Sequence, residues 1–216
     1  MKMKTEPVVF IVDDDEAIRE SLSYLLENAD FKVSCYDSAQ TFLEQFNQEQ
    51  PGCLLLDIRL PKMSGLELLK KLVAQDYSLP IIMLSGHGDI TMAVRAIKDG
   101  AFDFLEKPFE SSVLLERVQQ AIARDLKLRQ ESKERQEVLE RLAILTARER
   151  EVMVELIKGK PNKSVARELN ISYKTVEIHR GRIMEKMKAD GIVELVRMAM
   201  LCGLLSESMQ KSKEDF

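Results

Sequence analysis

The sequence has few of the residues that mark secreted, zinc-binding or membrane-spanning proteins. It contains three cysteines and two histidines in 216 residues. The cysteines are far apart, so neither a disulfide framework nor a zinc site is supported, and we expect inert thiols in a reducing compartment. No stretch approaches the roughly 20 apolar residues of a membrane span, and aspartates at 13–15 end the first apolar run too early for a signal peptide. We therefore expect a cytoplasmic protein without membrane contact.

The charge is unevenly distributed along the chain. The sequence is 45% hydrophobic and 31% charged with a net charge of -4, which is typical of a soluble globular chain of one or two domains. Residues 1–124 carry 13 basic and 20 acidic side chains, whereas residues 146–216 carry 14 and 11. The window 158–188 alone has nine basic and three acidic side chains. An acidic first part and a basic second part predict different partners for the two.

Five short apolar runs alternate with stretches of helical period in residues 1–124. The runs recur about 20 to 27 residues apart, which leaves room for one strand and one helix in each repeat. This spacing predicts an α/β domain with a five-stranded parallel, doubly wound, flavodoxin-like sheet and helices on both faces. The expected strands are 8–12, 31–36, 53–56, 80–84 and 102–105. The expected helices are 17–29, 38–48, 66–75, 90–98 and 111–123, and Asp15 is expected to cap the first of them.

Polar side chains follow four of the five expected strands. Asp13 and Asp14 follow the first, Asp57 the third, Ser85 the fourth and Lys107 the fifth. Ligands of open parallel sheets bind at this carboxyl edge. Carboxylates that meet there repel one another unless a cation joins them, and Mg²⁺ suits a site with two or three carboxylates. The metal and Lys107 would neutralise an incoming phosphoryl group, with one carboxylate as the nucleophile and Ser85 as a hydrogen-bond donor.

The rest of the chain is predicted to be helical. Residues 125–141 have few apolar side chains, balanced charge and neither Gly nor Pro, which favours a solvated helical linker over a coiled coil. Residues 142–206 predict a separate all-α domain of four helices, followed by a tail at 207–216. Thr146 and Glu149 predict a capping box for a helix that ends near residue 158. Asn162 is expected to cap a helix at 163–169, and Ser172 one that reaches residue 187.

The last two of these helices have the pattern of a helix-turn-helix. The turn between them is short, and the second helix carries excess positive charge. At 100° per residue, Val176, Ile183 and Met187 share one face of the second helix and are expected in the core. Arg180 lies beside that face, so we expect it first in an ion pair with an acid of the preceding helices and only second as a DNA contact.

The opposite face is suited to reading DNA, although a merely solvated basic face is the alternative. Lysine and arginine bind phosphates, Glu177 can accept from cytosine, and Ile178 can contact a thymine methyl. Gly181 in mid-helix costs about 1 kcal/mol relative to alanine, which indicates close approach of a backbone or phosphate. The predicted DNA-binding residues are Lys163, Lys174, Thr175, Glu177, Ile178, Gly181 and Arg182.

The first part of the chain resembles the receiver domains of two-component response regulators. The resemblance lies in IVDDD at 11–15, LDIRLPKMSG at 56–65, LSG at 84–86 and EKPF at 106–109. It implies that Asp57 is the phosphate acceptor and that Ser85 and Phe104 are the switch residues. It also implies a Mg²⁺ site. The implied ligands are Asp14, Asp57 and the backbone carbonyl of Arg59, with Asp13 acting through water.

The second part resembles the LuxR-type helix-turn-helix through LTAREREV at 145–152, NKSVA at 162–166 and KTVEIHR at 174–180. The combination is that of the NarL/FixJ class. It implies a transcription regulator that is phosphorylated by a sensor histidine kinase and binds double-stranded DNA as a phosphorylation-induced homodimer, with RNA polymerase as a further candidate partner. It implies no enzyme activity beyond Mg²⁺-dependent phosphorylation and dephosphorylation of its own aspartate. In relatives, the position of Gly181 can carry a larger side chain that reads a base.

Two other classes of protein remain open at this point. A phosphohydrolase with an aspartyl-phosphate intermediate would use the same carboxylates and metal. Haloacid-type phosphatases need a second acid two residues after the nucleophile, and Arg59 stands there instead. The other alternative is an adaptor whose receiver only docks proteins, which the basic second part argues against. As a further hypothesis, the acidic receiver docks on the basic domain and restrains it until it is phosphorylated.

Overall fold

The computed structural model describes residues 6–75, 77–86 and 90–204. The chain divides into two compact units, residues 1–129 and 130–216, which we describe separately. Within the described residues, we find no helix with the length and apolarity needed to cross a membrane. The predicted tail at 207–216 lies outside the described residues.

The first unit contains one parallel sheet with the strand order β2-β1-β3-β4-β5. The strands are β1 Val8–Val12, β2 Lys32–Tyr36, β3 Gly52–Asp57, β4 Ile81–Ser85 and β5 Asp103–Glu106. In the ladders, Val12 lies opposite Leu56, Asp57 opposite Leu84 and Ser85 opposite Glu106. This register brings the carboxyl ends of four strands to one edge. The predicted five-stranded, doubly wound sheet is therefore confirmed.

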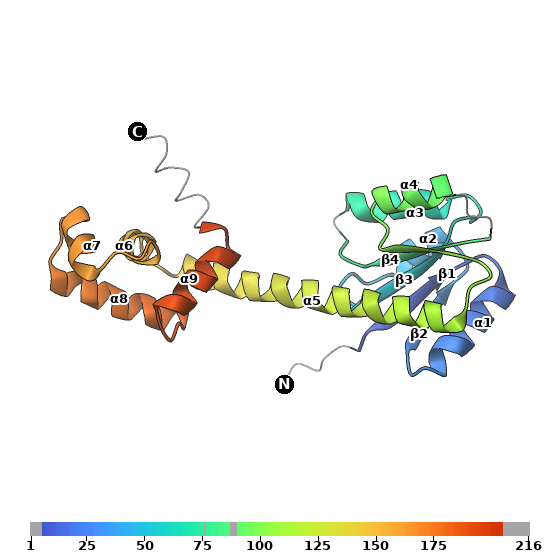
Figure 1. The fold of residues 1–216 in the computed structure, drawn as a ribbon, viewed down its shortest axis with the longest axis horizontal. Coiled ribbons are helices and arrows are strands. Elements are labelled where there is room, and N and C mark those ends of the chain that lie inside the picture. The colour runs from blue at the N-terminus through green and yellow to red at the C-terminus, as the bar shows by residue number, and fades with distance from the viewer. Residues whose placement is uncertain (1–5, 76, 87–89, 205–216) are drawn as a thin grey trace. The chain divides into compact units, whose positions relative to one another are not determined.

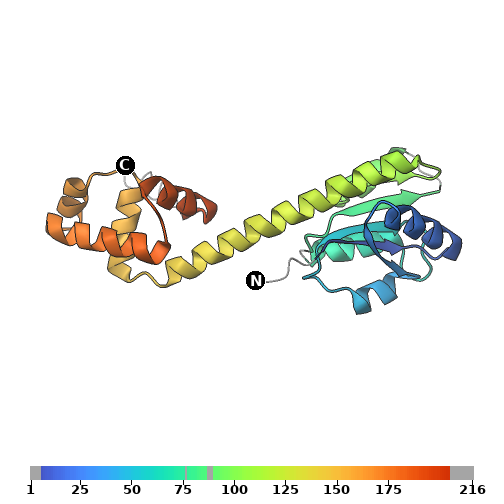
Figure 2. The ribbon, with the colours of Figure 1, turned by 90° about the horizontal axis from the view of Figure 1, so that it is seen from below.

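Helices cover both faces of this sheet. They are α1 Glu16–Glu27, α2 Ala39–Gln45, α3 Gly65–Ala74, α4 Ile90–Lys98 and α5 Ser111–Ala143. Helices α2, α3 and α4 lie on one face, and α1 and the first half of α5 on the other (Figure 1; Figure 2). The predicted cap is present, because the Asp15 side chain accepts from the backbone N–H groups of Ala17 and Ile18.

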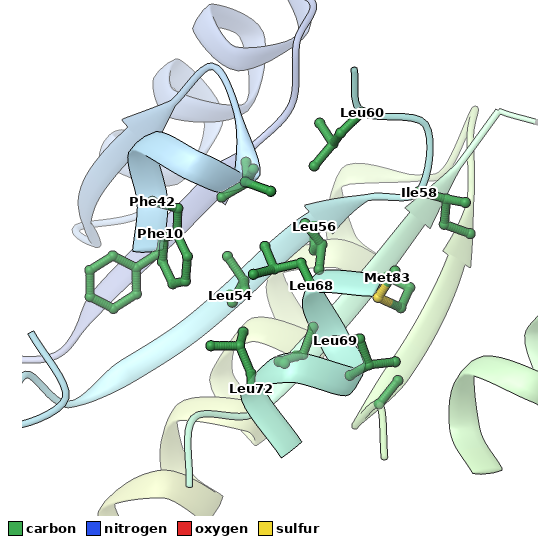
Figure 3. Packing of buried hydrophobic residues seen from close by; sticks show 14 of the residues in the cluster. Phe10, Phe42, Leu54, Leu56, Ile58, Leu60, Leu68, Leu69, Leu72 and Met83 are labelled. Carbon is green, nitrogen blue, oxygen red and sulfur yellow. The ribbon is translucent and has the colours of Figure 1, made fainter. Parts of the chain in front are cut away.

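The core of the first unit lies against β3. All six residues of this strand are buried, as expected for a strand that is covered on both faces. On one face, Leu54 and Leu56 pack with Phe10, Phe42 and leucines of α3 (Figure 3). β3 is the central strand and ends at Asp57, so packing on both faces fixes Asp57 on the carboxyl edge of the sheet.

The second unit is all-α in its described part. Its helices are α6 Ala147–Ile157, α7 Asn162–Glu168, α8 Tyr173–Met187 and α9 Ile192–Leu201, joined by the end of α5. The predicted capping box of Thr146 and Glu149 is present, and the Ser172 side chain caps α8 by accepting from the Thr175 N–H. Val176, Ile183 and Met187 are fully buried, as the helical spacing predicts.

Two local predictions in the second unit are wrong. The N-cap of α7 is Pro161, and Asn162 is the first helical residue rather than a cap. Its side-chain Oδ1 accepts a hydrogen bond from Arg180 Nη1 at 3.1 Å. The partner of Arg180 is therefore an amide and not an acid. Proline suits this position because it lacks the N–H group that a helix start leaves unpaired.

The segment predicted as a solvated linker, 125–141, lies within α5, which runs without interruption through both units. It is not solvated throughout. Asp125 is fully buried in the first unit, and Val138, with 5% of its surface exposed, packs in the core of the second. The solvated stretch is therefore shorter than the composition suggests, because both of its ends pack.

Candidate functional site

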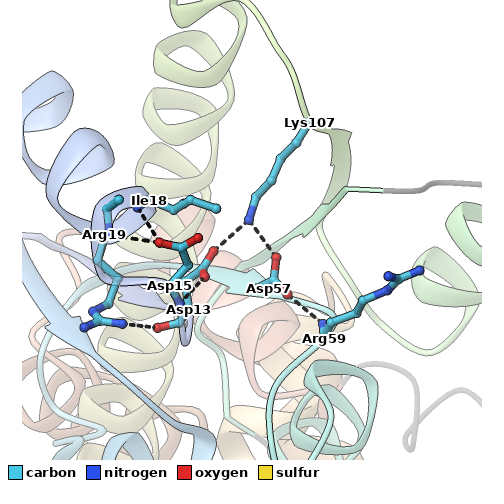
Figure 4. A network of polar contacts seen from close by, with 8 residues as sticks. Asp13, Asp15, Ile18, Arg19, Asp57, Arg59 and Lys107 are labelled. Atoms are coloured by element: carbon cyan, nitrogen blue, oxygen red, sulfur yellow. Dashed lines mark hydrogen bonds and ion pairs between the residues drawn. The ribbon is translucent and has the colours of Figure 1, made fainter.

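Lys107 joins two buried carboxylates at the carboxyl edge of the sheet (Figure 4). Its Nζ donates to Asp13 Oδ2 and to Asp57 Oδ1, each at 2.7 Å. Asp13 follows β1, Asp57 ends β3 and Lys107 follows β5, so three strands supply the three groups. The exposed fractions are 2% for Asp13 and 8% for Asp57. Three of the five side chains that the strand ends predict are brought together here.

Backbone groups fix the remaining oxygens of the two carboxylates. The Asp15 N–H donates to Asp13 Oδ1 at 3.0 Å, and the Arg59 N–H donates to Asp57 Oδ2 at 2.6 Å. Arg19 Nη1 donates to the backbone carbonyl of Asp13 at 2.8 Å and so holds the start of this loop (Figure 4). Each carboxylate is therefore held through both of its oxygens before any ligand binds.

The electrostatics of the site leave one negative charge without a partner. Burial lowers the pKa of Lys107, but hydrogen bonds to Asp13 and Asp57 and the charges of both outweigh burial, so its pKa is raised. Lys107 is therefore an ammonium at neutral pH. One ammonium faces two buried carboxylates, which makes the site attractive to a further cation.

Asp14 does not join this group, because its side chain is exposed while that of Asp13 is buried. In residues 6–75, 77–86 and 90–204, no three Asp, Glu, His or Cys side chains lie close enough together to hold a metal. The expected cluster of three carboxylates is thus a pair joined by Lys107. Neighbouring residues of an extended chain point in opposite directions, which separates the two side chains.

The two expected switch residues occupy different positions on the sheet. Ser85 is buried at the end of β4, and its backbone carbonyl accepts from the Lys107 N–H at 2.7 Å. Phe104 is half-buried on β5 and lines a groove of about 460 Å³ together with Val94 and Ile97 of α4. Ser85 thus lies beside the carboxylate pair, and Phe104 lies at the face formed by α4 and β5.

In the second unit, several basic side chains of the window 158–188 are engaged within the protein. Lys158 and Lys160 pair with Glu155 at 2.9 and 2.5 Å, and Lys186 pairs with Glu149 at 2.6 Å. The charge count of the window therefore overstates its capacity for phosphates. Most of the predicted contact residues remain available, because Lys163, Lys174, Glu177, Ile178, Gly181 and Arg182 are exposed.

The packing of this unit does not explain the residue type at two of these exposed positions, Ile178 and Gly181. Ile178 is 49% exposed on α8. A Cβ on Gly181 would have no atom within 4 Å, so the fold of this unit does not require glycine there. Thr175 is half-buried, and its hydroxyl shares a hydrogen bond of 2.8 Å with Ser172, which gives it a role at the start of the helix.

Sequence reasoning missed the contacts that join α8 to α6 and to the end of α5. Glu149 is 2% exposed, and its hydrogen bonds to Lys186 and to the Thr146 N–H lower its pKa to about 2. Arg141 Nη1 of α5 donates to the Met187 carbonyl at the end of α8 at 3.2 Å. The capping-box pattern identified one partner of Glu149, but no pattern identified Lys186 or Arg141.

The family models match both units. The response regulator receiver domain matches residues 9–119, and the model for bacterial regulatory proteins of the luxR family matches residues 143–199. The transcriptional regulatory protein FixJ of Bradyrhizobium diazoefficiens is 43% identical over 95% of this chain and 100% of its own length. The chain is a two-component response regulator of the NarL/FixJ class.

Other relatives of this response regulator agree. The response regulator protein TmoT of Ectopseudomonas mendocina is 44% identical over 89% of this chain and 88% of its own. The solved structure of the response regulator StyR has a TM-score of 0.82 at 42% identity and covers 90% of this chain and 98% of that one. Full-length FixJ from B. japonicum has a TM-score of 0.57 at 42% identity, with coverage of 93% and 99%. The chain is thus a transcription regulator with a LuxR-type DNA-binding domain.

Proposed function

We propose that Asp57 accepts a phosphoryl group from a partner histidine kinase and that this controls DNA binding. The observation that carries the proposal is the pair of buried carboxylates that share the Lys107 ammonium at 2.7 Å each. Asp57 is the nucleophile in this proposal, because its place at the end of β3 presents it to the carboxyl edge. Lys107 would stabilise the charge on the incoming phosphoryl oxygens, and Ser85 would donate a hydrogen bond to one of them.

The donor atoms of the site fit Mg²⁺, which prefers carboxylate, carbonyl and water oxygens. Asp14, Asp57 and the backbone carbonyl of Arg59 would hold the ion, with Asp13 contributing through water. When bound, Mg²⁺ supplies positive charge that neutralises the phosphoryl oxygens. The uncompensated charge of the Asp13–Asp57 pair supports a cation here, and Asp14 is assigned as a ligand from its place in the receiver motif. We propose no reaction beyond the phosphorylation and dephosphorylation of Asp57 itself.

The phosphorylated form is proposed to be a homodimer. Ser85 and Phe104 would respond to the phosphoryl group and change the face formed by α4 and β5. Val94 and Ile97 of α4 are each 47% exposed beside Phe104, which supports this face as a contact surface. A dimer would place two recognition helices about one turn of DNA apart.

Helix α8 is proposed to enter the major groove of double-stranded DNA in the cytoplasm, with RNA polymerase as a candidate partner. Lysine and arginine would contact phosphates, and Glu177 and Ile178 would contact base edges. Gly181 would allow close approach of the DNA, and nothing in this unit occupies the space where a Cβ would lie. The complete proposed set is Lys163, Lys174, Thr175, Glu177, Ile178, Gly181 and Arg182.

The test compares the wild type with Asp57→Asn after treatment with a small phosphodonor and Mg²⁺. Incorporated phosphate, sedimentation and enrichment of DNA from a random library are measured. A matched control is Asp30→Asn, since Asp30 is exposed and has a positive φ of 62° that asparagine adopts readily. We expect only Asp57→Asn to lose phosphate uptake, dimerisation and the gain in DNA binding. Equal responses in all three proteins would remove Asp57 from the mechanism, and steady release of phosphate would favour a hydrolase.

A further inference from the structure

A third buried acid of the receiver, Asp125, lies far from Asp13 and Asp57 along the chain. Asp125 is fully buried, and its Oδ2 accepts from the Gly52 N–H at 2.9 Å and from Arg129 Nε at 2.8 Å. Its Oδ1 is also buried and has no hydrogen-bond partner among the described residues. A buried carboxylate is costly unless it is paired, so its position requires an explanation.

Arg129 extends the same contact to the loop before β3. Its Nη2 donates to the carbonyls of Gln48 and Gln50 at 2.9 and 3.1 Å. The guanidinium thus joins an acid of α5 to two backbone carbonyls of the loop before β3. The receiver family model ends at residue 119, yet the compact unit continues to Arg129. Asp125 and Arg129 therefore hold α5 on the receiver beyond the limit of the common domain.

The contact is made at one end of the strand that carries the phosphate acceptor at its other end. β3 runs from Gly52, which Asp125 contacts, to Asp57. Gly52 has a φ of 155°, and a Cβ there would lie 1.8 Å from the Val8 carbonyl oxygen, so the backbone fits tightly against β1. The start of β3 is thus a rigid place at which to fix a helix.

The far end of α5 is held as well. Val138 is buried in the second unit, and Arg141 donates to the Met187 carbonyl of α8. Between the two attachments only residues 130–137 of α5 remain. Seven of these eight residues are exposed, and Glu134 is half-buried. A helix held on both sides of so short a span can transmit a change that a free coil would absorb.

We propose that Asp125 and Arg129 are positioning residues that couple the receiver to the DNA-binding domain. They fix α5 to the start of β3. A change in the receiver on phosphorylation would then reach the end of α5, where Arg141 contacts the end of α8. The proposal rests on the proposed function, because it requires that phosphorylation changes DNA binding. It assigns the pair no part in phosphoryl transfer.

The test uses the full chain with Arg129→Gln, Asp125→Asn and the conservative Arg129→Lys. The matched control is Glu116→Gln, which removes the charge of an exposed acid of α5 that accepts from Gln120 Nε2, four residues on, at 2.9 Å. Three quantities are measured for each: the rate of phosphate uptake from a small phosphodonor, amide exchange of residues 46–52 and 120–130, and DNA affinity with and without the donor. The DNA is a duplex selected by the wild type from a random library.

We expect the rate of phosphate uptake to stay within about twofold of the wild type in every variant. The gain in DNA affinity on phosphorylation should fall at least about fivefold in Arg129→Gln and Asp125→Asn, which is the lower end of typical coupling between two sites. Exchange should rise in both segments, Arg129→Lys should recover part of the gain, and the control should match the wild type. An unchanged gain despite faster exchange would overturn the proposal, and so would loss of uptake together with the gain. A wild type without any gain would instead refute the proposed function, and this inference with it.

Discussion

Replacing Lys107 by methionine tests whether its ammonium neutralises part of the charge of Asp13 and Asp57 at the phosphoacceptor site. Methionine is similar in length but removes the ammonium that bonds to Asp13 and Asp57. Both carboxylates would stay buried without a counter-charge. Removing one partner of a buried ion pair typically destabilises a protein by about 3–5 kcal/mol, which is a large part of the roughly 5–15 kcal/mol of a typical domain.

Mg²⁺ should rescue much of this loss. An ion that binds only the folded state stabilises it by about 2.7 kcal/mol at 100 times its dissociation constant. In the variant the ion meets two carboxylates without an ammonium, so it should bind more tightly than in the wild type and stabilise the variant more. The pKa of Lys107 in the folded protein is raised from 10.5. The stability that its ion pairs contribute is therefore complete below pH 10.5 and is lost only as the pH rises through the pKa of the folded state.

The assay is urea denaturation of the full chain at neutral pH, followed by amide exchange of β1 and β3 so that the receiver is observed by itself. Each protein is measured in chelator and in saturating Mg²⁺. The control is Lys70→Met, because Lys70 is half-exposed and pairs with Asp99 at 3.4 Å, where a loss of no more than about 1 kcal/mol is expected. If Mg²⁺ stabilised the wild type and Lys107→Met equally, the idea that Lys107 and the ion neutralise the same charge would fail.

Three further predictions concern the DNA-binding domain. Glu149→Gln should destabilise this domain by about 3 kcal/mol at neutral pH, because hydrogen bonds hold the pKa of Glu149 near 2 instead of 4.5. In denaturation experiments, the difference in stability from the wild type should shrink as the pH falls from 4.5 toward 2. A difference that stays constant over this range would contradict the prediction. Gly181→Ala should raise stability by about 0.5–1 kcal/mol yet weaken DNA binding in a filter assay, and unchanged binding would exclude close approach at this position. Lys174→Gln should lower the slope of log affinity against log salt by about 1 if Lys174 contacts a phosphate, whereas an unchanged slope would remove it from the interface.

The sheet was predictable because its three central strands, β1, β3 and β4, are short and buried. β3 reads as an uninterrupted apolar run that ends in Asp57, and both features follow from its central place in the sheet. The same argument located most of the site, since the carboxyl ends of parallel strands meet at one edge. It could not tell Asp13 from Asp14, because the direction of each side chain depends on where the strand stops.

The errors concern residues whose role depends on distant partners. Asp125 stands in a charged helix and looks like a surface residue, and only the fold brings it to the Gly52 N–H, 73 residues away in sequence. Asn162 fits the pattern of a helix cap, but Arg180 of another helix uses its side chain. Lys186 counts as a phosphate-binding charge in the sequence, yet it pairs with a buried acid. Local patterns therefore succeeded where contacts are local and failed where a long-range polar contact competed.

The buried carboxylates single out the phosphoacceptor site without reference to any motif. Four Asp or Glu residues are buried in the described part of the chain: Asp13, Asp57, Asp125 and Glu149. Asp125 has Arg129 as its cation and Glu149 has Lys186, so each of these charges is neutralised within the protein. Asp13 and Asp57 share Lys107. An additional cation at either of the first two sites would introduce an unpaired positive charge, whereas between Asp13 and Asp57 it would complete the neutralisation. The place where a metal and a phosphoryl group fit is therefore the one place among these four acids where the protein leaves its own charge unbalanced.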